Sequence, residues 1–144
     1  GLRLGDVRAL TWNKVFLASD GKTKFVRTIM EKTNKLVNVP LSKEALNCLN
    51  EKEDPNEPIF TLPGTPTVCH DIRKWMQNAD IKKHISFHTS RHTFGTLAIL
   101  AGCDILTVSK LLGHKSVKTT QIYASVAMQM RADAVKRVEK VFGN

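Results

Sequence analysis

The sequence has few cysteines and no long apolar run, and both shortages narrow what the protein can be. Its three cysteines are odd in number and widely spaced, with no CxxC pair, at Cys48, Cys69 and Cys103. This spacing excludes a disulfide framework and favours reduced thiols in a cytoplasmic protein. No apolar run is long enough to cross a membrane, and no basic-then-apolar leader opens the chain, so we expect no membrane partner.

Acidic residues are also scarce. The chain has 13 aspartates and glutamates against 22 lysines and arginines, which gives a net charge of +9 and a pI near 9.7. An excess of positive charge favours a polyanionic partner, because each neutralised phosphate releases counterions. The plainer alternative is that many of the lysines are only solvated. Charge alone therefore puts nucleic acid slightly ahead as the expected partner.

Apolar periodicity predicts a mainly helical domain with a small three-stranded antiparallel sheet. A chain of 144 residues suits a single domain with its own core. The expected strands cover 14–20, 23–30 and 35–40. The expected helices cover 4–10, 42–50, 67–79, 88–101, 104–112, 116–124 and 127–142, and a polar surface loop covers 51–58.

Several residues predict helix ends and buried faces. Ser42, Asp104 and Ser116 occupy N-cap positions, and Gly102 and Gly113 follow the ends of helices. The buried faces are expected to contain Val68, Ile72, Trp75 and Met76 in the helix over 67–79, and Phe94, Leu97, Ala98 and Ala101 in the helix over 88–101.

His88 and Arg91 are three positions apart on an expected helix, so they share a face, with Cβ atoms roughly 5–6 Å apart. Together they would suit a phosphate oxygen, since two charge-assisted donors would converge on one anion. The alternative is a surface pair, or a histidine bonded to a backbone carbonyl. For a single HxxR pattern that structural interpretation is favoured.

His84, His88 and His92 recur at four-residue intervals, a spacing that can bind a metal. His84 precedes the expected helix, however, and no carboxylate or cysteine stands among the three. We therefore predict no metal site. His92 is interpreted as a structural residue with its ring nitrogen on the backbone.

The single tyrosine, Tyr123, stands nine residues after His114, which follows Gly113 at the end of an expected helix. A histidine in such a turn can donate to an oxyanion or cap the preceding carbonyls. A phenol with a pKa of about 10 is a poor nucleophile at neutral pH unless cations or a base help remove its proton. Tyr123 is therefore either a core side chain or a nucleophile beside cations that would stabilise a pentacoordinate phosphate.

Arg3 and Lys32 lie far from these residues in sequence but have distinctive surroundings. Arg3 precedes the first expected helix, and Asp6 would either orient Arg3 or cap its own helix. Lys32 lies at the tip of a hairpin, where a flexible ammonium could protonate a leaving oxygen as a general acid. Most hairpin lysines are simply solvated, so this role depends on the other residues.

These residues together resemble the catalytic domain of the tyrosine recombinases, the phage integrase family. The resemblance runs the length of the chain, and its segments follow the family's order. They are Gly1-Leu2-Arg3-Leu4-Gly5-Asp6-Val7, Glu31-Lys32-Thr33-Asn34-Lys35, His88-Thr89-Ser90-Arg91-His92-Thr93-Phe94, Leu111-Leu112-Gly113-His114 and Thr119-Thr120-Gln121-Ile122-Tyr123. One segment alone would be weak evidence, whereas five in order are strong evidence. The family usually has Ser-Glu where this chain has Gly5-Asp6, so the acid is kept but shortened.

The resemblance implies strand transfer on double-stranded DNA without a metal or cofactor. The tyrosine would attack a phosphodiester, form a 3′-phosphotyrosyl link and release a 5′-hydroxyl. Arg3, Arg91 and His114 would hold the phosphate, and Lys32 would protonate the leaving oxygen. His88 would assist proton transfer or position the tyrosine.

The resemblance also implies an incomplete protein and an assembly on DNA. The first helices of the catalytic domain and a separate N-terminal core-binding domain would precede Arg3, so residues 1–144 are expected to be one N-terminally truncated catalytic domain. Residues 127–142 carry an apolar stripe that would dock on a neighbouring protomer of a tetramer or pack on their own domain. Lys35 and Lys115 would contact DNA.

Three functions are therefore weighed. The first is a site-specific recombinase or integrase, bacterial or phage-encoded, that acts on a mobile element. The second is a non-catalytic helical DNA-binding domain, and the third is a metal-dependent phosphoesterase. The complete set of six residues favours the first. A binding module has no need of a lone tyrosine after a Gly-His turn, and a metalloenzyme would need carboxylates near its histidines.

Overall fold

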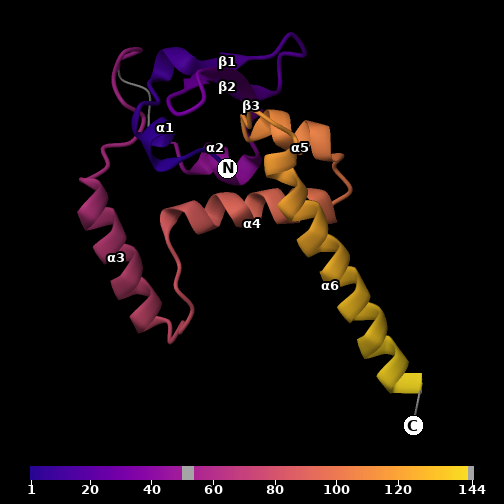
Figure 1. Ribbon diagram of the computed structural model, residues 1–144. Coiled ribbons are helices and arrows are strands. Elements are labelled where there is room, and N and C mark those ends of the chain that lie inside the picture. Colours follow the sequence, from indigo (N-terminus) through magenta and orange to yellow (C-terminus); the bar gives the residue numbers. More distant parts are fainter. Residues whose placement is uncertain (50–53, 143–144) are drawn as a thin grey trace.

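The computed structural model describes residues 1–49 and 54–142. The elements in chain order are α1 (Leu4–Arg8), the 3-10 helix η1 (Trp12–Lys14), β1 (Val15–Leu17), β2 (Lys24–Met30), β3 (Lys35–Pro40), α2 (Lys43–Asn47), α3 (Thr65–Asn78), α4 (Phe87–Leu100), α5 (Ile105–Leu111) and α6 (Lys118–Phe142). The small sheet lies at the top of the view, with the longer helices α3, α4 and α6 below it (Figure 1). The predicted fold class, mainly helical with one three-stranded antiparallel sheet, is confirmed.

The sheet has the order β1-β2-β3, and it is buried on one face. Alternation along β2 places Val26, Thr28 and Met30 inward, as the two-residue period of a strand requires. Met30 pairs with Lys35 at the end of the β2–β3 ladder, and Asn34 completes the intervening turn with a φ of 52°. The hairpin tip at residues 31–34 is thus held in a defined place.

The core has two parts. Leu10, Val26 and Ile59 form one cluster beneath the sheet. The second cluster contains Val108, Leu112 and Tyr123, and it joins α5 and α6 to apolar residues of α4. The lone tyrosine is therefore a core residue, whatever else it does.

Gly113 lies where the end of α5 meets the sheet. It ends α5 with a φ of +62°, a conformation that favours glycine. A Cβ atom there would lie 2.9 Å from Met30 Cγ and 2.9 Å from Val37 Cγ1, so α5 meets the sheet at a point where only glycine fits. His114 follows Gly113 in the chain, so this contact with the sheet fixes where His114 lies.

One boundary was predicted wrongly. The helices predicted over 116–124 and 127–142 are one continuous helix, α6, which begins at Lys118. The two predicted helices are separated by Ser125 and Val126. Neither residue is a helix breaker such as glycine or proline, so the helix continues through them. The C-terminal half of α6 projects away from the body of the domain (Figure 1), and its predicted stripe, including Met130, Val138 and Val141, is exposed.

Two predicted buried faces also need correction. Trp75 is 60% exposed, and Met76 is the buried residue of α3, which stands apart from most of the domain (Figure 1). On α4, Leu97 and Ala101 are exposed, whereas Arg91 and Gly95 are buried. The buried face of α4 therefore contains Arg91 of the HxxR motif. A count of apolar residues cannot reveal this, because arginine is polar.

The remaining differences are small. The strand expected over 14–20 is shortened to β1, and the helix after Ser42 ends at Asn47, although Ser42 caps it as predicted. Residues 50–53 of the expected helix and loop lie outside the described residues, residues 55–56 form a turn, and Pro58 forms an isolated β-bridge with Thr11. Within the described ranges, no helix is both long and apolar enough to span a bilayer.

Candidate active site

Arg91 is the central cation of the site. It lies in the second turn of α4 and is only 1% exposed. Its Nη1 donates to the carbonyl of Gly1 at 2.7 Å, and its Nη2 donates to the carbonyl of Leu112. Burial, and after it the charge of nearby Arg3, lowers the pKa of Arg91 to about 10, so the side chain stays charged at neutral pH.

No acidic side chain among the described residues forms a direct ion pair with Arg91. Within residues 1–49 and 54–142, the acidic groups paired with basic side chains are Asp6, with Arg3, and Asp71, with His70. Two neutral carbonyls thus hold a buried guanidinium, and three of its five N–H donors are left for other acceptors. Such a site attracts an anion, because a buried charge is costly until it is neutralised.

Arg3 is the N-cap residue of α1, and Asp6 one turn later faces it. Arg3 Nη1 lies 3.8 Å from Asp6 Oδ2, and both atoms are buried without a hydrogen-bond partner. The other oxygen, Asp6 Oδ1, accepts a hydrogen bond of 2.9 Å from the Glu31 backbone N–H. Of the two predicted roles for Asp6, the structure shows the first: it faces Arg3 and does not cap α1.

The bond from Glu31 to Asp6 brings the β2–β3 hairpin tip to α1. Lys32, which follows Glu31, lines a hollow of about 380 Å³ together with Arg3, Gly5, Asp6 and Glu31. The predicted general acid and the predicted phosphate-binding arginine therefore share one cavity. The buried Nη1 of Arg3 faces Asp6 but makes no hydrogen bond within the described residues, so an anion near this cavity would satisfy it.

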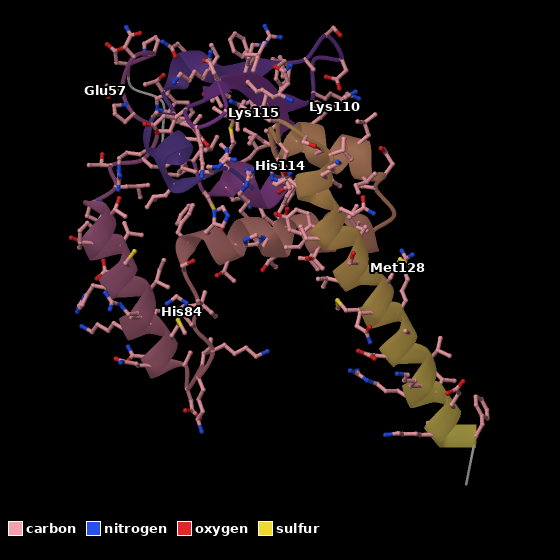
Figure 2. The ribbon with its side chains drawn as sticks, viewed as in Figure 1. Glu57, His84, Lys110, His114, Lys115 and Met128 are labelled. Atoms are coloured by element: carbon pink, nitrogen blue, oxygen red, sulfur yellow. The ribbon has the colours of Figure 1, made fainter. Side chains whose placement is uncertain are left out.

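Two further lysines, Lys35 and Lys115, lie close together near His114. Lys35 Nζ donates to the His114 carbonyl at 2.8 Å and to the Lys115 carbonyl at 3.5 Å. Lys35 thus ties β3 to the turn before α6, and that turn contains the exposed Lys115 (Figure 2). Contact of either lysine with DNA stays a prediction.

His114 lies at the junction of the sheet, α4 and α6 (Figure 2) and is 7% exposed. Its Nδ1 is 2.8 Å from the hydroxyl of buried Thr120. Burial lowers the pKa of His114 to about 4, and Arg91 and Arg3 contribute in the same direction, so the ring is neutral at neutral pH. When Thr120 donates to Nδ1, the one ring proton lies on Nε2, where it can be donated to an anion.

Tyr123 projects from the second turn of α6 and is 3% exposed. Its ring stacks on His114, with centroids 6.2 Å apart and planes 21° apart. On the other side it touches Gly95 of α4, where a Cβ atom would lie only 2.7 Å from Tyr123 Cε2. Burial raises the pKa of Tyr123, while Arg91 and Arg3 act in the opposite direction without cancelling the effect. The phenol is therefore protonated in the resting site.

The two histidines of α4 lie edge to face, with the ring centroids of His88 and His92 4.7 Å apart. The pKa of His88 is lowered, chiefly by burial and then by His92, Arg91, Arg3 and Lys32. His92 was predicted to bond the backbone, and this was wrong. Its Nδ1 lies 3.2 Å from the Tyr123 hydroxyl.

The structure thus gathers the six predicted residues around one region and adds others. Arg3 and Arg91 act electrostatically on His88, His114 and Tyr123, and Lys32 acts on His88. Sequence reasoning missed three contacts at this site, made by His92, Gly95 and Thr120. Spacing could have indicated His92, which is one helical turn beyond His88 on the same face. His84 is exposed outside α4, and the described part of the chain holds no cluster of three His, Cys, Asp or Glu side chains suited to a metal.

Comparison with known proteins identifies the family. The sequence matches the model of the Phage integrase family over residues 1–130. The chain belongs to the phage integrase family. A tyrosine recombinase of Thermosipho africanus is 36% identical over 121 residues, which covers 79% of this chain and 43% of that protein. The tyrosine recombinase XerD of Pseudomonas putida is 33% identical over 143 residues, which covers 88% of this chain and 46% of that protein.

Solved structures agree on the fold. The XerA recombinase superposes with a TM-score of 0.68 at 28% identity and covers 92% of this chain and 52% of its own. The catalytic domain of bacteriophage HP1 integrase gives a TM-score of 0.66 at 24% identity, over 93% of this chain and 73% of that domain. The chain spans about half the length of the curated phage integrase family relatives that it matches.

Proposed function

We propose that this chain is the catalytic domain of a site-specific recombinase that cleaves and rejoins double-stranded DNA through a 3′-phosphotyrosyl intermediate. The observation that carries the proposal is the position of Tyr123, a phenol packed against neutral His114 and within the field of two arginines that have unused donors. A structural tyrosine would not need this surplus of positive charge. Membership of the phage integrase family supports the same chemistry.

The geometry suggests how the step would proceed. Tyr123 Oη would attack the phosphorus, and the bond from phosphorus to the 5′-oxygen would break. Arg91 and Arg3 would bind the non-bridging oxygens, which gain charge in the transition state, and His114 would donate Nε2–H to the same phosphate. Lys32, on its hairpin tip, would give its proton to the leaving 5′-oxygen. A 5′-hydroxyl from another strand would then reverse the step, and the phosphotyrosyl bond conserves the energy for it.

The partners follow from the same argument. The net charge of +9 suits the DNA backbone, and Lys35 and Lys115 lie at the edge of the site, where they would contact phosphates. A structure of the XerH recombinase, which has the same fold with a TM-score of 0.72 at 18% identity over 96% of this chain and 42% of its own, was solved bound to difH substrate. We propose that the biological reaction is the integration or excision of a mobile element.

We further propose that the full-length protein assembles as a tetramer on DNA. The apolar stripe on the C-terminal half of α6 is exposed on its own domain and would be covered by a neighbouring protomer. Sedimentation on DNA with and without residues 127–144 tests this. Unchanged assembly after the truncation would refute it.

A nicked suicide duplex tests the chemistry. The full-length protein should be incubated with a duplex selected from a random library by binding, with EDTA present throughout. A covalent adduct should form with the wild type and disappear with Tyr123→Phe, a change that removes only the hydroxyl. An adduct that persists in this variant would assign the chemistry to another residue. DNA binding without any adduct would make the chain a non-catalytic DNA-binding domain.

A further inference from the structure

The Tyr123 hydroxyl must lose a proton when it becomes a nucleophile, and its hydrogen-bond partner is a residue to which the six-residue site gives no role. We propose that His92 is a further catalytic residue, the base that receives the Tyr123 proton during cleavage. This inference rests on the proposed function. It is carried by the contact of His92 Nδ1 with Tyr123 Oη at 3.2 Å.

The geometry suits proton transfer. A separation of 3.2 Å is within the reach of a general base, about 2.6–3.2 Å between heavy atoms. The rings meet edge to face, with centroids 5.7 Å apart and planes 61° apart, so the imidazole presents an edge to the phenol. His92 is an exposed residue of α4, so the proton that it receives can pass on to water.

The other two histidines are less well placed for this step. His114 stacks on the face of the phenol, with planes 21° apart, and its Nδ1 is already bonded to Thr120. Its pKa of about 4 would also make it a weak base. The ring of His88 lies edge to face with that of His92, with centroids 4.7 Å apart, whereas the Tyr123 hydroxyl contacts His92. The place of His88 suits orientation of His92 and exchange of its proton.

The proposed step balances. The O–H bond of Tyr123 breaks as Nδ1 of His92 takes the proton and Oη bonds to phosphorus. The bond from phosphorus to the 5′-oxygen breaks, and that oxygen takes its proton from Lys32. The groups that face His92 are His88 on its own helix, Tyr123 from α6 and His114 from the turn before α6. When the strand is rejoined, the attacking 5′-hydroxyl gives its proton to Lys32, and the leaving phenolate of Tyr123 takes a proton from His92.

The test separates proton transfer from simple positioning. His92→Asn puts a carbonyl oxygen close to the place of Nδ1, so it can still accept the phenol hydrogen bond, but it cannot take the proton. Single-turnover adduct formation on the nicked duplex should fall about 10²- to 10⁴-fold, the usual contribution of a general base. The residual rate should rise with pH as hydroxide replaces the base. His84→Asn, at an exposed histidine outside α4, should match the wild type.

A second substrate distinguishes loss of proton transfer from Tyr123 from loss of proton transfer to the leaving 5′-oxygen. In a duplex with sulfur in place of the bridging 5′-oxygen, the leaving group needs no general acid. This duplex should restore cleavage by Lys32→Ala but not by His92→Asn. A wild-type cleavage rate in His92→Asn would overturn the role of His92 as a base. Cleavage by His92→Ala that is faster than cleavage by His92→Asn would overturn it as well. If Tyr123→Phe formed adduct at the same time, the proposed function itself would fail, so the two failures are distinguishable.

Discussion

Lowering the pH should destabilise the domain through His114. In the unfolded chain the pKa of this histidine returns to about 6.5, whereas burial beside Arg91 and Arg3 holds it at about 4 in the folded protein. Between these values the unfolded chain binds a proton that the folded chain does not, so the free energy of unfolding falls as the pH falls. From about pH 7.5 to about pH 4.5 the linkage amounts to about 2.5 kcal/mol.

Urea unfolding at several pH values checks this magnitude. The wild type should be compared with His114→Asn, in which an amide oxygen can still accept from Thr120 but nothing titrates. The stability of the variant should fall by about 2.5 kcal/mol less over the same range. The pKa of His88 is also lowered, so it adds a slope common to both proteins. Parallel curves for the wild type and His114→Asn would refute the assignment of a buried, neutral His114.

Three other changes should act at defined contacts. Arg91→Ala leaves the buried Leu112 carbonyl without its donor; urea unfolding should show a loss of at least about 1–3 kcal/mol, and no adduct should form. Gly95→Val places side-chain atoms where the Tyr123 ring lies, so single-turnover cleavage should fall about 10²-fold, with a stability loss of about 1–3 kcal/mol. Asp104→Ala removes the cap that accepts from the Leu106 and Thr107 amides, at about 1 kcal/mol, and should leave the cleavage rate unchanged.

The sequence predicts the elements well where local signals are strong. Strand β3 has the predicted bounds, and Ser42 and Asp104 cap helices as expected, because alternation and capping are properties of short segments. The exposure of Trp75 was not predictable in this way. Whether an apolar helix face is covered depends on where neighbouring elements lie, and α3 meets little of the domain.

The site residues were chosen by type and order, but their interactions were not visible in the sequence. Nothing in the pattern indicates that Arg91 is held by the carbonyls of Gly1 and Leu112, since carbonyls have no sequence signature. The contact of His92 with Tyr123 joins residues 31 positions apart and depends on how α6 crosses α4. The close approach at Gly95 is set by the same crossing.

The continuity of α6 makes the helix a rigid lever. Tyr123 and the exposed Val141 lie 18 residues apart on one helix without a hinge, a span of about 27 Å at 1.5 Å per residue. A tilt of α6 imposed at its C-terminal end would rotate the whole helix about its contact with α4, where the Tyr123 ring packs. The angle between α6 and α4 therefore sets the distance between Tyr123 Oη and His92. A contact that fixes the C-terminal end of α6 would therefore also fix the position of the Tyr123 hydroxyl.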